Sequence, residues 1–159
     1  MLLPIPRENG TKLQLAPQPH IRAHLQCPKQ KLGGVISFLI DTGADITVIM
    51  PDDREEICIP NRLLVDGHPS FIGGIGGGLS LRYLRNITLE FHDESGELIV
   101  PFRLDQIAVA CPKQTKYYKG KPSILGRDFL SGCAINISSA GISLLCENTE
   151  DNPYLGKLT

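Results

Sequence analysis

The feature that most constrains the fold is an apolar run that ends abruptly at an acid. Residues 35–40 read Val-Ile-Ser-Phe-Leu-Ile, and Asp41-Thr42-Gly43 follows directly. A short apolar run bounded by a turn signal is typical of a buried strand, and the glycine favours a tight turn. The pattern therefore predicts that Asp41 lies where a core strand stops. A carboxylate at the edge of a core is unfavourable unless it is hydrogen-bonded, paired or used in chemistry, so Asp41 is the first candidate functional residue.

Composition restricts the classes of function. The chain has 159 residues and a formal net charge of -1, which fits one domain without an electrostatic footprint for nucleic acid or an anionic membrane. The opening residues are too short and proline-rich for a signal peptide, and no run approaches the ~20 apolar residues of a membrane span. We expect a soluble, cytoplasmic protein that binds neither.

The cysteines and histidines give no sign of a metal or cofactor. Five cysteines are scattered without a Cys-x-x-Cys pair, which argues against a disulfide framework and a zinc site and fits a reducing cytosol. His20 and His24 are spaced i, i+4, but they flank a strand-like stretch with no third ligand nearby. Packed or surface histidines are the simpler interpretation, so we expect no metal and no cofactor.

Short strand-like runs separated by glycine and proline turns predict an all-β domain of the barrel or sandwich type. The expected strands are 21–27, 35–40, 48–50, 82–91, 98–110, 123–126, 134–137 and 142–146, with a turn at 28–34, a helical turn at 51–56 and a short helix at 127–132. Residues 1–20 are expected to form an irregular arm, 21–146 the domain and 147–159 a polar tail. The loop 112–122, which carries four lysines, is interpreted as a solvated surface loop.

A glycine-rich segment marks a second candidate functional element. Residues 71–79 read Phe-Ile-Gly-Gly-Ile-Gly-Gly-Gly-Leu, with five glycines in six residues between apolar flanks. Glycines in this number predict a hairpin tip that takes positive backbone angles and lies close to another backbone. An ordinary surface hairpin is the competing interpretation.

Three features in order resemble the retropepsins, the single-lobe aspartic proteases of retroviruses and their relatives. These are the strand into Asp41-Thr42-Gly43-Ala44-Asp45, the glycine hairpin, and the strand into Ile124-Leu125-Gly126-Arg127-Asp128. The likeness covers about Ile21 to Leu130. It implies a closed acid-protease barrel with one short C-terminal helix, active as a symmetric homodimer on peptide substrates.

Residue roles follow from the resemblance. Asp41 would be the general acid or base, the Thr42 hydroxyl would cross the dimer axis, and Gly43 would let the backbone approach the carboxylates. The expected substrate-binding residues are Ala44, Asp45, Ile72, Gly73, Gly74, Ile75 and Gly76, the last five belonging to a flap that closes over substrate. Arg127 would support the loop by a bidentate fork onto Asp45, although Asp45 can also be read as an ordinary turn-capping acid.

Chemistry explains why a partner is needed. Hydrolysis of an amide without a metal requires water to be deprotonated while the carbonyl oxygen is protonated. Two facing carboxyls that share one proton do both, which is the established pattern of aspartic proteases. This chain has one Asp-Thr-Gly and no length for a duplicated lobe, so the second carboxyl must come from another copy.

Two functions from different classes remain open at this point. The first is a homodimeric aspartic endopeptidase, and the second is a catalytically weak dimerisation or peptide-binding module. The chain continues past Leu130 into a predicted hairpin at 134–146. That hairpin resembles the cellular and bacterial relatives, whose strands after the helix contribute to dimerisation, so we expect a free-standing enzyme in preference to a viral maturation protease.

Overall fold

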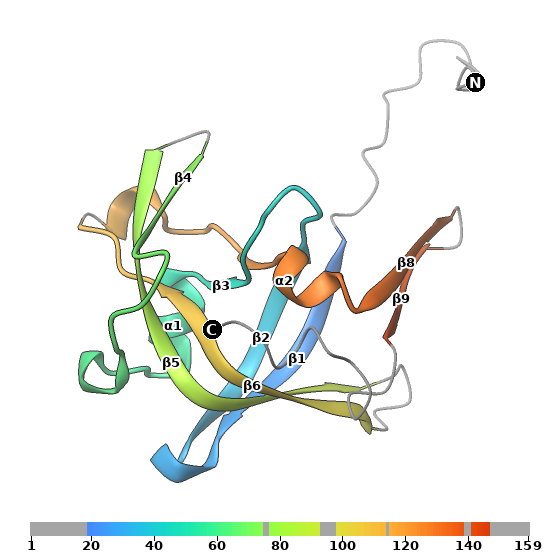
Figure 1. Ribbon diagram of the computed structural model, residues 1–159, viewed down its shortest axis with the longest axis horizontal. Helices are drawn as coiled ribbons and strands as arrows, with labels where there is room; N and C mark the ends of the chain where they lie inside the picture. The colour runs from blue at the N-terminus through green and yellow to red at the C-terminus, as the bar shows by residue number, and fades with distance from the viewer. Residues whose placement is uncertain (1–18, 75–76, 93–97, 114, 139–140, 147–159) are drawn as a thin grey trace.

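The computed structural model describes residues 19–74, 77–92, 98–113, 115–138 and 141–146, and strands dominate it (Figure 1). The strands are β1 (His20–Cys27), β2 (Leu32–Ile40), β3 (Val48–Ile49), β4 (Phe71–Gly74), β5 (Gly77–His92), β6 (Leu98–Ala110), β7 (Ser123–Leu125), β8 (Cys133–Ser138) and β9 (Gly141–Cys146). The helical elements are α1 (Pro51–Glu56), α2 (Arg127–Leu130) and the 3₁₀ turns η1 (Pro28–Gln30), η2 (Asn61–Leu63) and η3 (Thr115–Tyr117). The predicted N-terminal arm up to residue 18, the tail from 147 and the hairpin tip at Ile75 and Gly76 lie outside the described residues.

Six strands close into a barrel. The order in the main sheet is β1-β2-β7-β3-β6-β5-β4, and β1 also pairs with β5. The β1–β5 pairing joins the two sides of this sheet, and of its seven strands β4 stays outside the closed ring. The all-β prediction is confirmed, and the choice between barrel and sandwich is decided in favour of the barrel. A barrel of this kind leaves few open edges.

The first hairpin departs from the prediction in its turn. Only Pro28–Gln30 and Lys31, whose φ is 52°, make the connection, and β2 already begins at Leu32. The glycines expected in the turn therefore lie within the strand, with Gly34 opposite Leu25. A Cβ on Gly34 would lie 2.4 Å from Ile57 Cγ2, so the glycine is needed where the end of α1 packs on β2.

The two predicted helical segments are confirmed. Pro51 begins α1, and Asp52 and Asp53 lie in its first turn, where acids favour the positive end of the helix dipole. The second helix docks through Phe129, whose ring lies 4.9 Å from the ring of Phe102 between centroids. This aromatic contact attaches α2 to β6 on the barrel.

The cysteines depart from expectation at one position. Cys27, Cys58 and Cys111 are free, but Cys133 is disulfide-bonded, and its register partner across the β8–β9 hairpin is Cys146. Spacing along the sequence missed this because an antiparallel register brings residues far apart in sequence opposite each other. Disulfides are rare in a reducing cytosol, so this bond weakens the cysteine argument for a cytoplasmic location.

Within the described part of the chain, no helix is long and apolar enough to cross a membrane.

Candidate active site

Asp41 occupies the predicted position at the end of β2. Its backbone N–H donates to the carbonyl of Leu125 in β7 at 3.1 Å, and Ala44 N–H donates to the carbonyl of Asp41 at 3.2 Å, which closes a tight turn. The Gly43 N–H donates to Asp41 Oδ1 at 2.9 Å. Asp41 is half-buried, whereas Thr42 and Gly43 are exposed. The acid is thus held in one orientation at the surface end of a core strand.

A short ladder joins the Asp41 loop to the start of α2. Arg127 N–H donates to the carbonyl of Ala44 at 2.8 Å, and Asp128 N–H donates to the carbonyl of Asp45 at 3.1 Å. Gly126 makes this approach possible, since a Cβ there would lie 2.5 Å from the carbonyl carbon of Ile46. The segment 124–128 of the resemblance therefore braces the loop through its backbone.

Thr47 and Asp128, which the sequence did not mark as site residues, form the buried side of this brace. Asp128 Oδ1 accepts hydrogen bonds from Thr47 N–H at 2.8 Å, from Thr47 Oγ1 at 2.6 Å and from Phe129 N–H at 2.9 Å. Thr47 Oγ1 in turn accepts from Gly126 N–H at 3.0 Å. The available signal was a hydroxyl residue just before the buried run Val48-Ile49, together with an acid in the first turn of a helix.

Asp45 and Arg127 come together as predicted, but their geometry is simpler. Arg127 Nη2 contacts Asp45 Oδ1 in an ion pair whose side chains are 61% and 75% exposed. The contact is a single nitrogen–oxygen pair instead of the expected bidentate fork. At this exposure water screens most of the attraction, so the backbone ladder and the Thr47–Asp128 bonds are the stronger supports of the loop.

The predicted glycine hairpin is formed by β4 and β5. Its register pairs Ile72 with Leu79, Gly73 with Gly78 and Gly74 with Gly77. The Phe71 ring lies against Gly78, because a Cβ on that glycine would be 1.9 Å from Phe71 Cζ. Among the described residues, no hydrogen bond or ion pair joins this hairpin to the loop 41–47. The structure therefore describes the hairpin up to Gly74 and from Gly77 onward.

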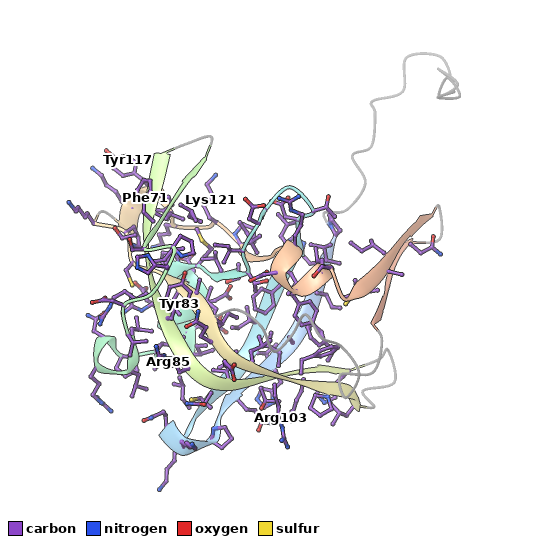
Figure 2. All side chains as sticks on the ribbon, viewed as in Figure 1. Phe71, Tyr83, Arg85, Arg103, Tyr117 and Lys121 are labelled. Carbon is purple, nitrogen blue, oxygen red and sulfur yellow. The ribbon has the colours of Figure 1, made fainter. Side chains whose placement is uncertain are left out.

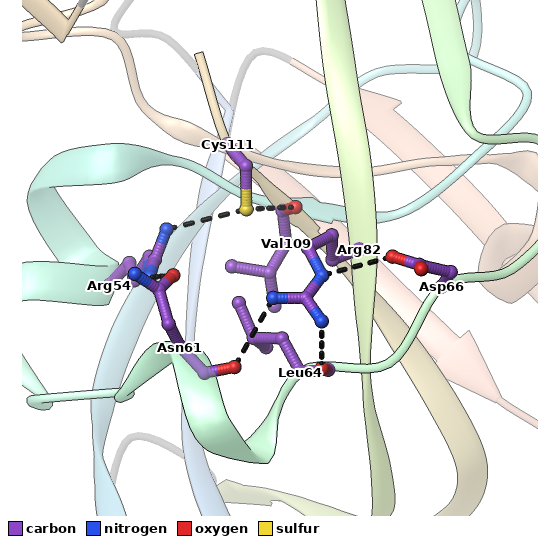
Figure 3. A network of polar contacts seen from close by, with 7 residues as sticks. All are labelled: Arg54, Asn61, Leu64, Asp66, Arg82, Val109 and Cys111. Atoms are coloured by element: carbon purple, nitrogen blue, oxygen red, sulfur yellow. Dashed lines mark hydrogen bonds and ion pairs between the residues drawn. The ribbon is translucent and has the colours of Figure 1, made fainter. Parts of the chain in front are cut away.

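A polar network fixes the elements beneath the hairpin (Figure 3). Arg82 of β5 donates from Nε to Asp66 Oδ1 at 3.1 Å and from Nη1 to the carbonyl of Asn61 at 3.2 Å. Arg54 of α1 donates from Nη2 to Asn61 Oδ1 at 2.6 Å and from Nη1 to Cys111 Sγ at 3.3 Å. The two guanidinium groups tie α1 and η2 to β5, which is one strand of the hairpin, and to Cys111 directly after β6.

A cavity of about 460 Å³ lies beside Asp45. It is also lined by Ile46, His68, Tyr83, Arg85, Gln106 and Asp128. The Tyr83 hydroxyl donates to the carbonyl of Pro69 at 2.8 Å. Burial, and then the negative charge of Asp128, raise the pKa of Tyr83 above its ordinary value of 10.0, so this phenol is neutral at physiological pH.

No group of three or more His, Cys, Asp or Glu side chains within the described residues is arranged to hold a metal ion.

Comparison with known proteins gives the family of the chain. The model of the retroviral aspartyl protease family matches residues 15–138. Among solved structures, EIAV protease complexed with the inhibitor HBY-793 is similar at 22% identity, over 76% of this chain and 92% of that chain, with a TM-score of 0.44. No curated protein matches the chain. Since the family model covers well over half of its length, the chain belongs to the retroviral aspartyl protease family.

Proposed function

We propose that the protein is an aspartic endopeptidase that acts as a homodimer, with Asp41 of each copy contributing one of the two catalytic carboxyls. The observation that carries the proposal is a contrast between two acids of the same site. Asp128 accepts three hydrogen bonds from its own chain. Asp41 accepts one, from Gly43, and its carboxylate has no other donor among the described residues. A carboxylate offers about four acceptor positions, so Asp41 keeps capacity for a water or a second carboxyl.

The proposed mechanism uses the pair as one acid and one base. The ionised carboxyl takes a proton from a water held between the two Asp41 residues, and the water oxygen attacks the scissile carbonyl carbon. The protonated carboxyl gives its proton to the carbonyl oxygen, which forms a neutral gem-diol. The carboxyl that took the proton from water then gives it to the amide nitrogen, and one gem-diol hydroxyl returns its proton to a carboxylate as the C–N bond breaks, so that the acid and amine products leave and the pair is again singly protonated. Like charges at such close range keep both groups from ionising together.

The remaining predicted site residues take supporting roles in this proposal. Thr42 is exposed and is free to meet the second copy at the axis. Ala44 and Asp45 would line the floor that binds the extended substrate backbone, and Arg127 would hold Asp45 in place. The hairpin of β4 and β5, with Ile72, Gly73, Gly74 and the tip residues Ile75 and Gly76, would close over the peptide, donate backbone N–H groups and exclude water.

The test is cleavage of a peptide library by the wild type and by Asp41→Asn, with pepstatin as the inhibitor. We expect the wild type to cut and the variant, which keeps the shape of the side chain, to be inactive. If the dimeric wild type cuts nothing from acid to neutral pH, or if Asp41→Asn cuts equally well, the protease proposal is wrong. The first of these outcomes would leave the peptide-binding or dimerisation module as the function.

A mixing experiment tests the shared site. Wild type and Asp41→Asn are combined in equal amounts at constant total concentration and allowed to exchange subunits. If each site needs two Asp41 residues, activity falls to about one quarter of the all-wild-type value, because only that fraction of dimers carries both. Activity of about one half would mean that each chain acts alone and would contradict the homodimeric site.

A further inference from the structure

The loop of residues 115–122, here called the lysine loop, lies beside the hairpin of β4 and β5. The Tyr118 hydroxyl donates to the carbonyl of Gly78 in β5 at 2.9 Å. Tyr118 also packs against the small core cluster of Val48, Met50, Leu81, Tyr83, Ala108 and Ala110, against which Ile72 and Leu79 of the two hairpin strands pack as well. In Figure 2, Tyr117 and Lys121 of the loop appear at the same end of the molecule as Phe71 of β4. The lysine loop therefore borders the hairpin on the same chain.

The other end of the lysine loop leads to the Asp41 strand. Its last residue, Pro122, is followed directly by β7, in which Ser123 pairs with Phe38 and Leu125 pairs with Ile40. The loop thus spans from the hairpin to the strand that ends at Asp41. The two ends of the lysine loop thus adjoin the hairpin on one side and, through β7, the strand of Asp41 on the other.

The lysine loop is positively charged, and its lysines form no ion pair with the described residues. Lys116, Lys119 and Lys121 are exposed, and there is no acid between Asp105 and Asp128 in the sequence. The ion pairs of arginine or lysine within the described residues are Arg82–Asp66 and Arg127–Asp45. This concentration of charge stands out in a chain whose formal net charge is -1.

Acids do contact this segment, but they bind neutral donors. Asp52 Oδ2 accepts from the Gly120 N–H at 2.7 Å, and Asp53 Oδ2 accepts from the Ser123 hydroxyl at 2.5 Å. Lys116 Nζ lies 5.0 Å from the centroid of the Tyr117 ring, and Tyr117 is itself 64% exposed. The backbone of the lysine loop is fixed on α1 and on the hairpin, while its ammonium groups face solvent. Exposed ammonium groups on a backbone that is already held in place can bind anions with little loss of loop entropy.

We propose that the lysine loop is a specificity element that selects peptide segments carrying acidic side chains next to the bound core. The inference rests on the proposed function for the location of the peptide, and it adds the chemical class of that peptide. Acidic residues flanking the apolar stretch held between hairpin and floor would pair with Lys119 and Lys121. Exposed pairs are individually weak, so the preference is expected to be a few-fold per pair and sensitive to salt.

The experiment measures binding separately from cleavage. Two fluorescently labelled peptides share the same short apolar core, which is flanked on both sides by a pair of Glu residues in one peptide and by a pair of Gln residues in the other. Binding to the Asp41→Asn protein is followed by anisotropy, and cleavage by the wild type is followed in parallel. We expect the Glu peptide to bind about 3 to 10 times more tightly than the Gln peptide, with the difference shrinking between about 0.05 and 0.5 M salt.

A matched pair of charge variants assigns the effect to the loop. Lys119→Gln/Lys121→Gln should remove the preference for Glu without changing the affinity for the Gln peptide. Lys29→Gln/Lys31→Gln removes the same charge from the turn between β1 and β2, which lies at the opposite end of the molecule from β4 (Figure 1), and should keep the preference. Thermal unfolding of both variants checks that they fold.

Each outcome separates this inference from the proposed function. If the Glu preference is absent, or if both lysine pairs affect it equally, the lysine loop is not a specificity element, whatever the cleavage result. If the preference depends on Lys119 and Lys121 but the wild type cuts neither these peptides nor any library peptide, the specificity element stands and the protease proposal fails. If wild-type cleavage also follows the Glu preference through a lower KM, both are supported.

Discussion

Thr47→Val tests whether the Asp41 loop depends on buried hydrogen bonds to β7 and α2. Thr47 is 3% exposed, and its hydroxyl donates to Asp128 Oδ1 at 2.6 Å and accepts from Gly126 N–H at 3.0 Å. Valine keeps the shape and removes both bonds. Leaving the buried Gly126 amide without a partner costs about 1–3 kcal/mol, and a bond to a charged acceptor contributes about 1.5–3 kcal/mol. We therefore expect a loss of about 2.5–6 kcal/mol in the free energy of unfolding.

The assay is urea denaturation at one protein concentration, because dimerisation would make the apparent stability depend on concentration. Thr47→Ser is the control, since it keeps the hydroxyl and loses one methyl group, worth about 1 kcal/mol. If the valine and serine variants unfold with free energies within about 0.5 kcal/mol of each other, the hydrogen bonds of Thr47 do not hold the loop. A cycle with Asp128→Asn then isolates the Thr47–Asp128 interaction, which we expect to be at least about 0.5 kcal/mol.

Three further predictions concern the surroundings of the same loop. Gly126→Ala would place a Cβ 2.5 Å from the carbonyl carbon of Ile46, so the two backbone segments must move apart. We expect the free energy of unfolding, measured by urea denaturation, to fall by more than about 2 kcal/mol. An unchanged urea midpoint would contradict the close approach of Gly126 to Ile46. Arg127→Ala removes an exposed contact to Asp45, so the free energy of unfolding should change by less than about 1 kcal/mol while kcat/KM of the proposed cleavage falls. A larger change in stability with full activity would show that the contact is structural only. The raised pKa of Tyr83 means that the unfolded chain ionises first as the pH rises, so this residue stabilises the fold fully below about pH 10 and less above it. The free energy of unfolding should therefore fall less between about pH 9 and about pH 11 in Tyr83→Phe than in the wild type. An equal fall in the two proteins would mean that Tyr83 does not cause the loss of stability.

The parts of the site that sequence could predict are those encoded by adjacent residues. An apolar run that breaks at Asp41-Thr42-Gly43 defines a strand, a turn and the exposed end of the strand within a few residues. The glycine hairpin is equally local, and the register of β4 with β5 centres it on residues 75 and 76. Pro51 and the acids after it likewise mark the start of α1. These predictions succeeded because local chemistry and tertiary structure favour the same conformation.

The parts that sequence did not reveal depend on contacts between distant segments. Thr47 and Asp128 are separated by 81 positions, and nothing near either residue specifies the other. Gly34 looked like a turn residue, yet it serves the packing of Ile57, which is set by the position of α1 on the barrel. The bonded state of Cys133 follows from a strand register that spacing along the chain does not display.

The hairpin of β8 and β9 bears on the proposed second copy. It forms a two-stranded sheet of its own, separate from the barrel among the described strands, and Ile135 and Leu144 pack on the main core from it. A two-stranded hairpin is marginal alone, and among the described strands neither β8 nor β9 pairs with a third strand. Thr42 and Gly43 are exposed at the site as well. In the described part of the chain, both the two-stranded sheet and the Asp41 site therefore leave room for a second copy. A second copy that paired with the β8–β9 edges and brought its own Asp41 to the axis would complete both at once, which is why we place dimerisation and catalysis in a single equilibrium.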